Sequence, residues 1–316
     1  MAIETVTGPV EAEDLGVTLV HEHLRATSES VRVQFPHLYD LEEEVRHAVA
    51  QVERAQGHGV KTIVDPACMD LGRDVRLAER VVEETGIQLV MCTGIYSVRY
   101  EHLPAGMAFR DEDYLADAFV HDLEQGIQGT SIKAHFLKCA VDEPGFTDDI
   151  TKIFKAVAKA SLSTGAPIMA HTHPGTQRGL EVLELFENEG VDLAKVQLAH
   201  TGDTDDLEHI EALVARGGRW LGMDRYGLDA FFLPRDKRNA AIAELCRRGH
   251  ADKLMLSHDA CATIDWFPRE LVHQMAPDWH FGFIHEEILP QLREAGVSDE
   301  QIEQMLVANP AGWLSA

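Results

Sequence analysis

Short apolar runs alternate with longer amphipathic segments from one end of the chain to the other. In residues 41–56, apolar side chains recur every three to four positions, which predicts a helix with one apolar face. Comparable helical patterns lie at 73–85, 111–126, 147–164, 176–189, 204–216, 235–248 and 281–295, with a last helix near 299–308. The β-rich runs that predict strands lie at 17–23, 60–66, 87–94, 131–140, 167–172, 196–201, 219–224 and 253–259.

Eight strands, each followed by a helix, predict an α/β fold of the closed (β/α)₈ type, as one domain over residues 1–316. The alternative is an open doubly wound sheet, but no Gly-x-Gly-x-x-Gly turn follows the first strand. The longest connection, residues 261–279, comes after the eighth strand. In a barrel it would lie over the mouth at the C-terminal ends of the strands, where such enzymes have their active sites.

Candidate chemistry begins at His21-Glu22-His23, which follows the apolar run 17–20. Because alternate side chains of a strand share a face, His21 and His23 project together and Glu22 points away. Two neutral imidazoles on one rigid strand suit a transition-metal ion. A His-x-His pair also occurs by chance, so the metal hypothesis depends on what ends the other strands.

Four later strands end in further potential ligands, namely Lys138, His171, His200 and Asp259. Lys133 shares the strand of Lys138, but only Lys138 is near its C-terminal end. His258 and Asp259 are adjacent and face opposite sides, so the sequence barely chooses between them. The candidates lie on strands one, four, five, six and eight, and strands one and eight become neighbours only when the sheet closes.

A lysine among histidines needs explaining, because an ammonium group repels a metal ion. Two dications about 4 Å apart repel each other by roughly 16 kcal/mol at an effective dielectric constant of 20, so bridging anions must offset this repulsion. A neutral Lys138 amine that is carboxylated by CO₂ would supply an anionic bridge with two oxygen atoms. The alternative is a Lys138 ion pair with a carboxylate at the barrel rim.

Asp203, three residues after His200, is a candidate to support that histidine from behind.

Net charge, cysteine spacing and the lengths of the apolar runs limit the partners and the cellular location that we expect. The formal net charge of −25 argues against a surface for nucleic acid or anionic membranes. The five cysteines are far apart and lack Cys-x-x-Cys spacing, which favours buried reduced thiols. No secretory signal and no apolar run of about 20 residues is visible. We therefore expect a cytoplasmic protein without nucleic-acid or membrane partners.

The combined motifs resemble those of the phosphotriesterase family of the amidohydrolase superfamily, and within it the phosphotriesterase-like lactonases fit best. The similarity runs over nearly the whole chain. The segments that carry it are His21–Leu24, Phe136–Lys138, Ala170–Thr172, His200–Asp205, Gly222–Gly227 and Ser257–Asp259, with Asp142–Gly145, Leu233–Arg238 and Cys261–Trp266 as further matches to the lactonase branch.

This resemblance implies two divalent ions, and Zn, Co, Fe and Mn all suit the ligand types. It assigns His21, His23 and Asp259 to the more buried ion and His171 and His200 to the more exposed one. Carboxylated Lys138 and a hydroxide would bridge them, and Tyr96 and Arg225 would sit beside and beneath the ions. One departure is Val98, where relatives often carry a second aromatic residue. The resemblance further implies a homodimer.

The implied reaction is hydrolysis of lactone esters, above all N-acyl homoserine lactones, which would make the enzyme quorum-quenching. Slow hydrolysis of phosphotriesters is an expected side activity, because their tetrahedral centre has a similar shape. Trp266 and Phe267 are candidates to line an acyl-chain pocket, with helix-capping core as the alternative. The other hypotheses are a dedicated phosphotriesterase or an amidase of the superfamily, and a barrel that binds a metal or ligand without turnover.

Overall fold

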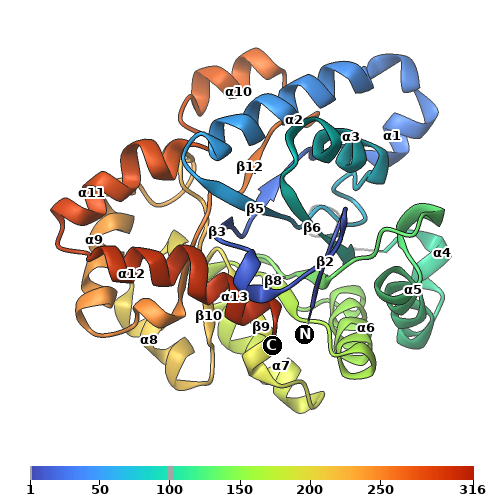
Figure 1. Cartoon of the computed structure of the whole chain (residues 1–316). Helices are drawn as coiled ribbons and strands as arrows, with labels where there is room; N and C mark the ends of the chain where they lie inside the picture. Colours follow the sequence, from blue (N-terminus) through green and yellow to red (C-terminus); the bar gives the residue numbers. More distant parts are fainter. Residues whose placement is uncertain (1, 98–102) are drawn as a thin grey trace.

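The computed structural model describes residues 2–97 and 103–316, and it has the expected barrel (Figure 1). Eight parallel strands follow one another in the order β11-β10-β9-β8-β7-β6-β5-β3. Their bounds are β3 Val17–Leu19, β5 Val60–Asp65, β6 Gln88–Gly94, β7 Phe136–Ala140, β8 Ile168–His171, β9 Val196–Ala199, β10 Trp220–Met223 and β11 Leu254–Leu256.

A short parallel pair closes the ring between the first and last strands. Strand β4 (Glu22–His23) continues β3, and β12 (Ala260–Cys261) continues β11. These two segments pair in the register Ala260 to Glu22 and Cys261 to His23. The candidate ligands from the two ends of the chain therefore lie on adjacent strands.

Eight helices surround the strands (Figure 1). They are α2 Leu41–Gln56, α3 Val75–Thr85, α5 Glu112–Glu124, α6 Asp148–Thr164, α7 Arg178–Asn188, α8 Leu207–Ala215, α9 Arg235–Arg247 and α11 Leu289–Glu294. Helix α6 shows why these segments are helical. The Thr147 side chain caps its first turn, and Gly165, with φ of 80°, ends it in a left-handed conformation.

The N-terminal end of the barrel is sealed by the two chain termini. The hairpin of β1 (Ile3–Thr5) and β2 (Gly8–Val10) and helix α13 (Asn309–Leu314) lie across it (Figure 1). There Ile3, Leu15 and Trp313 are fully buried against Phe136 of β7. His135 joins both termini, because its Nδ1 accepts from the Glu4 amide and its Nε2 contacts the Leu314 carbonyl. Among the described residues, the cavity that holds the candidate ligands lies at the opposite end of the barrel.

The remaining elements are short. They are α1 Glu29–Gln34, α4 Ala105–Ala108, α10 Arg269–Met275, α12 Asp299–Glu303, the π-helical turns η8 Ile284–Ile288 and η9 Gln304–Ala308, and the 3₁₀ turns η1 Ala12–Asp14, η2 Pro36–Leu38, η3 Ile127–Gly129, η4 Pro174–Thr176, η5 Leu193–Lys195, η6 Thr201–Asp203 and η7 Ala251–Lys253. None of the helices in the described residues is long and apolar enough to cross a membrane.

Several observed bounds differ from those expected. The fourth strand begins at Phe136 rather than at residue 131, because the chain before it turns and holds Lys133 outside the sheet. The first and eighth strands are each interrupted before the ligands that follow them. The segment expected as one helix over 281–295 begins with the π-helical turn η8 and continues as α11.

Candidate metal centre

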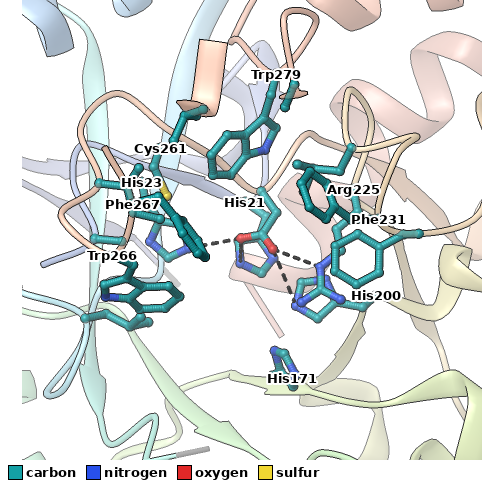
Figure 2. Close-up of a pocket in the computed structure, with 18 of the residues that line it drawn as sticks. His21, His23, His171, His200, Arg225, Phe231, Cys261, Trp266, Phe267 and Trp279 are labelled. Carbon is teal, nitrogen blue, oxygen red and sulfur yellow. Dashed lines mark hydrogen bonds and ion pairs between the residues drawn. The ribbon is translucent and has the colours of Figure 1, made fainter. Parts of the chain in front are cut away.

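The six candidate ligands meet in one cavity of about 370 Å³ at the open end of the barrel. Four imidazoles face one another on its floor, and aromatic side chains stand around it (Figure 2). The ring centroids of His171 and His200 are 4.5 Å apart, and those of His21 and His200 are 5.0 Å apart. The lining ligand candidates are His21, His23, Lys138, His171, His200 and Asp259.

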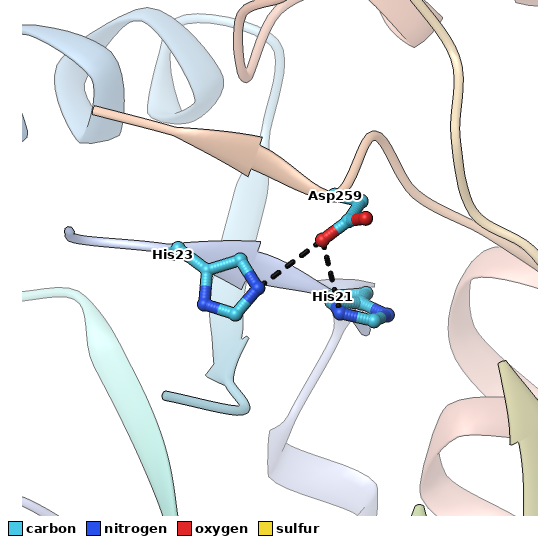
Figure 3. Close-up of side chains that lie close together, drawn as sticks. All are labelled: His21, His23 and Asp259. Atoms are coloured by element: carbon cyan, nitrogen blue, oxygen red, sulfur yellow. Dashed lines mark hydrogen bonds and ion pairs between the residues drawn. The ribbon is translucent and has the colours of Figure 1, made fainter. Parts of the chain in front are cut away.

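Asp259 joins the two histidines of the first strand (Figure 3). One carboxylate oxygen, Oδ1, lies 3.2 Å from His21 Nε2 and 3.1 Å from His23 Nε2. Burial alone would raise the pKa of Asp259, but His21 and His23 hold it well below its usual range. An ionised oxygen and two imidazole nitrogens within this distance form a set that could hold one metal ion.

His258, the open alternative to Asp259, lies on the other side of the strand. It is fully buried, and its Nδ1 is 2.6 Å from the Glu22 carboxylate. The structure therefore brings Asp259 into the cavity and His258 behind it.

Asp224 holds two of the histidines from behind. Its Oδ2 lies 2.9 Å from His21 Nδ1, and its Oδ1 lies 3.1 Å from His200 Nδ1 and accepts from the His200 amide at 2.7 Å. With both Nδ1 atoms engaged, the Nε2 atoms of His21 and His200 are the ones that can face the cavity. Although Asp224 can be grouped with these histidines as a ligand, its oxygens are already satisfied and it does not line the cavity.

Asp142 does the same for His171. Its Oδ2 lies 3.3 Å from His171 Nε2, which leaves Nδ1 as the ring nitrogen available to a ligand. Burial lowers the pKa of His171 to about 4, so its imidazole is neutral near pH 7 and can coordinate a metal. Sequence reasoning missed Asp142 and Asp224 as supports, although both stand within the motifs that carry the family resemblance.

Asp203 does not take the expected place behind His200. Its two oxygens accept from Arg225 Nη1 at 2.8 Å and Arg238 Nη2 at 2.9 Å. Arg225 in turn donates from Nε to Asp259 Oδ2 at 3.0 Å. Arg225 thus lines the cavity and ties Asp259 to Asp203.

Lys138 is buried among the ligands with 1 % of its surface exposed. Within the described residues 2–97 and 103–316 no carboxylate lies in ion-pair distance, and the amine instead approaches Met169 Sδ at 3.2 Å. The rim ion pair considered as an alternative is therefore not formed. Burial lowers the pKa of Lys138, although Asp259 opposes the shift, and this moves the side chain towards its neutral amine.

The remaining sequence candidates line the cavity walls. The Tyr96 ring stands edge-on to His171, with centroids 5.5 Å apart, and burial raises its pKa, so the phenol keeps its proton. Trp266 and Phe267 form one side together with Leu271 and Met275 of α10. The connection 261–279 therefore lies over the mouth, as expected. Val98 lies outside the described residues.

Comparison with known proteins gives a consistent result. The model of the phosphotriesterase family matches residues 1–314. An aryldialkylphosphatase of Saccharolobus solfataricus is 47% identical over 308 residues, which cover 97% of each chain. A phosphotriesterase homology protein of Mycobacterium tuberculosis is 42% identical over 98% of this chain and 96% of its own. The solved structure of the phosphotriesterase from Mycobacterium tuberculosis superposes with a TM-score of 0.93, 42% identity and coverage of 99% and 98%.

Proposed function

The chain belongs to the phosphotriesterase family of binuclear metal-dependent ester hydrolases, and from this premise we propose that it is a lactonase. Its substrates would be N-acyl homoserine lactones, and its physiological role would be quorum quenching. Phosphotriester hydrolysis would be a side activity. The observation that carries the proposal is one cavity in which six potential ligands form the floor and apolar side chains form the walls.

The donor set fits two transition-metal ions. Four imidazoles, one carboxylate and a lysine whose pKa is lowered by burial line the same cavity. His21, His23 and Asp259 would hold the buried ion, and His171 and His200 the more exposed one. The Lys138 amine would attack CO₂ and release one proton to solvent, which would give an anionic carbamate as a further ligand. Zn, Co, Fe and Mn all suit these ligands.

When bound, two such ions lower the pKa of water and polarise the oxygen of a carbonyl or phosphoryl group. Ionised Asp259 would accept the proton of the attacking water and pass it to the alkoxide that leaves as the ester C–O bond breaks. Arg225 would keep Asp259 oriented through its Nε hydrogen bond. The protonated Tyr96 phenol would donate to the substrate near the reacting carbon.

The walls supply the argument for acyl chains. Trp266, Phe267 and Leu271 line the same cavity as the ligands, and burial of each methylene group of a chain there would be worth about 0.8 kcal/mol. The expected homodimer and the cytoplasmic location stay predictions. Light scattering would measure the oligomeric state, and cell fractionation would measure the location.

A dedicated phosphotriesterase is the second candidate, because a relative at 47% identity is named an aryldialkylphosphatase. Steady-state kinetics with N-decanoyl homoserine lactone and with a diethyl aryl phosphate separate the two. We expect kcat/KM for the lactone to exceed that for the phosphotriester by orders of magnitude. The reverse order would replace the lactonase proposal with the second candidate, and no turnover of either by metal-loaded protein would contradict both.

A further inference from the structure

Glu22 and His258 lie next to the candidate ligands in sequence but on the other face of the barrel wall. Glu22 separates His21 from His23, and His258 precedes Asp259. Both are completely buried, and the Glu22 Oε1 lies 2.6 Å from His258 Nδ1. A buried carboxylate is expensive unless its oxygens are well satisfied, so its partners indicate what it does.

The partners of Glu22 are the groups around Asp259. Oε1 accepts from the Ser257 hydroxyl at 2.8 Å and from the His258 amide at 3.0 Å, and Oε2 accepts from the Ala260 amide at 3.1 Å. The backbone on both sides of Asp259 is thus held by one carboxylate. Ser257 Oγ also accepts from the His21 amide at 2.9 Å, which ties the first ligand to the same cluster.

Asp259 needs such support because its backbone is in the left-handed region, with φ of 52°. Aspartate adopts this conformation more readily than most residues but still at a cost, so the surrounding hydrogen bonds help to hold it. The Asp259 amide donates to the His21 carbonyl at 2.9 Å. The Glu22 carboxylate accepts from the amides on either side of it, those of His258 and of Ala260 at the start of β12.

His258 fixes Glu22 and links it to the cavity wall. The Ile284 amide donates to His258 Nε2 at 3.0 Å, so Nε2 is the acceptor and Nδ1 carries the proton that faces Glu22. The His258 carbonyl accepts from Trp279 Nε1 at 3.2 Å, and Trp279 lines the cavity. The His258 imidazole therefore connects the Glu22 carboxylate to the helical turn η8 behind the barrel.

We infer that Glu22 and His258 are positioning residues: their hydrogen bonds hold Asp259 in its left-handed conformation and so aim its carboxylate at His21 and His23. The inference rests on the proposed function, because it concerns the aim of a ligand and proton acceptor. It does not require either residue to touch substrate.

Two substitutions of His258 separate positioning from mere structural support. The Asn amide nitrogen can replace Nδ1 and still donate to Glu22, whereas a Gln side chain reaches the place of Nε2 and loses that donor. Each variant loses one buried hydrogen bond, so we expect His258→Asn and His258→Gln to lower the Tm by similar amounts. Only His258→Gln should disturb Asp259.

Metal affinity, measured by competition with a chromogenic chelator, is the first readout, and lactone kinetics is the second. Loss of a residue behind a metal ligand costs about 10–100-fold in affinity or activity, so His258→Gln should lose about that much of both, mostly in kcat. His258→Asn should stay within about threefold of wild type, well short of that loss. Glu22→Gln places an amide donor against the Ala260 amide, and it should resemble His258→Gln even if the latter folds poorly.

His135 supplies the matched control, because it is also buried and also joins two partners, at the sealed end of the barrel. His135→Asn should lower the Tm but keep wild-type metal affinity and kcat. Equal losses in His258→Asn and His258→Gln, or wild-type affinity and kcat in both His258→Gln and Glu22→Gln, would overturn the inference. A wild-type protein that binds no metal and hydrolyses no ester would instead overturn the proposed function.

Discussion

Lys138 shows how surroundings decide what one side chain can do. Lys133 and Lys138 lie five positions apart, but Lys133 has 37% of its side chain exposed and lies 3.9 Å from Glu4. Lys138 is buried among imidazoles, and burial lowers its pKa. Its burial therefore shifts Lys138 towards the neutral amine, the form that reacts with CO₂.

Lys138→Ala should remove the proposed bridge between the two ions. Because loss of a residue behind a ligand already costs about 10–100-fold, we expect kcat/KM to fall by at least ~100-fold, with loss of bound metal. Elemental analysis and lactone kinetics measure both effects. Lys133→Ala is the control and should match wild type, whereas near-normal activity of Lys138→Ala would exclude the bridge.

Asp259→Asn tests the proton acceptor. The amide keeps the size of the side chain but cannot take a proton, and general acid–base groups contribute about 10²–10⁴-fold to rates. We therefore expect kcat to fall within that range while KM changes little. Metal content is measured on the same samples, and a variant with full rate and full metal would rule out the proton role of Asp259.

At the scale of elements, the wall after β12 is fixed by a contact far from it in sequence. Asp265 accepts from the Tyr39 hydroxyl at 2.7 Å and from the Ser28 amide at 2.9 Å. These bonds anchor the segment that carries Trp266 and Phe267 against the connection between β4 and α2. The wall proposed for the acyl chain is therefore anchored by these bonds.

Phe267→Ala should shorten the apolar surface at the mouth, where the ring is 48% exposed. A lost contact worth about 1 kcal/mol corresponds to roughly a fivefold rise in KM for a long-chain lactone, with little effect on a short-chain one. Kinetics over a series of chain lengths measures this. Phe109→Ala, at a ring that is 90% exposed and lines none of the described cavities, is the control; equal effects on all chain lengths would argue against an acyl-chain wall.

The periodicity of apolar residues predicted the number and order of the barrel elements but not the residues at which each begins and ends. The fourth strand was expected to begin at residue 131, yet Lys133 and His135 precede it, because alternation cannot tell a strand from the extended chain leading to it. Asp203 was expected behind His200 on sequence distance. Asp224 takes that place because β9 and β10 pair side by side, a long-range contact that one sequence does not reveal.

At the scale of the whole molecule, the closed ring joins groups that are more than two hundred residues apart. The β4–β12 seam brings Asp259 to His21, and the opposite end is sealed by both termini around His135. Closure was predictable because ligands on the first and last strands need a common site. The packing of both termini around His135 at the other end was not predictable, because it depends on side chains that belong to no recognisable motif.

Acid should weaken the fold through His135. Burial lowers its pKa to about 4, whereas an unfolded histidine titrates near 6.5. Below pH 6.5 the unfolded chain takes up a proton that the folded chain refuses, so stability is complete above that pH and is lost as the pH falls towards 4. The full loss is about 3 kcal/mol for this group. Urea unfolding of wild type and His135→Asn between pH 4.5 and 7 should show the shallower pH dependence in the variant; parallel curves would contradict this.

The central claim is that six side chains hold two metal ions bridged by a carboxylated lysine. A crystal of the metal-loaded protein, with anomalous scattering recorded at the metal edge, tests it most directly. We predict two anomalous peaks in the cavity, in contact with His21, His23, His171, His200 and Asp259. We also predict electron density for a carboxyl group beyond the Lys138 amine. A single peak, or none after soaking with divalent salts, would contradict the account.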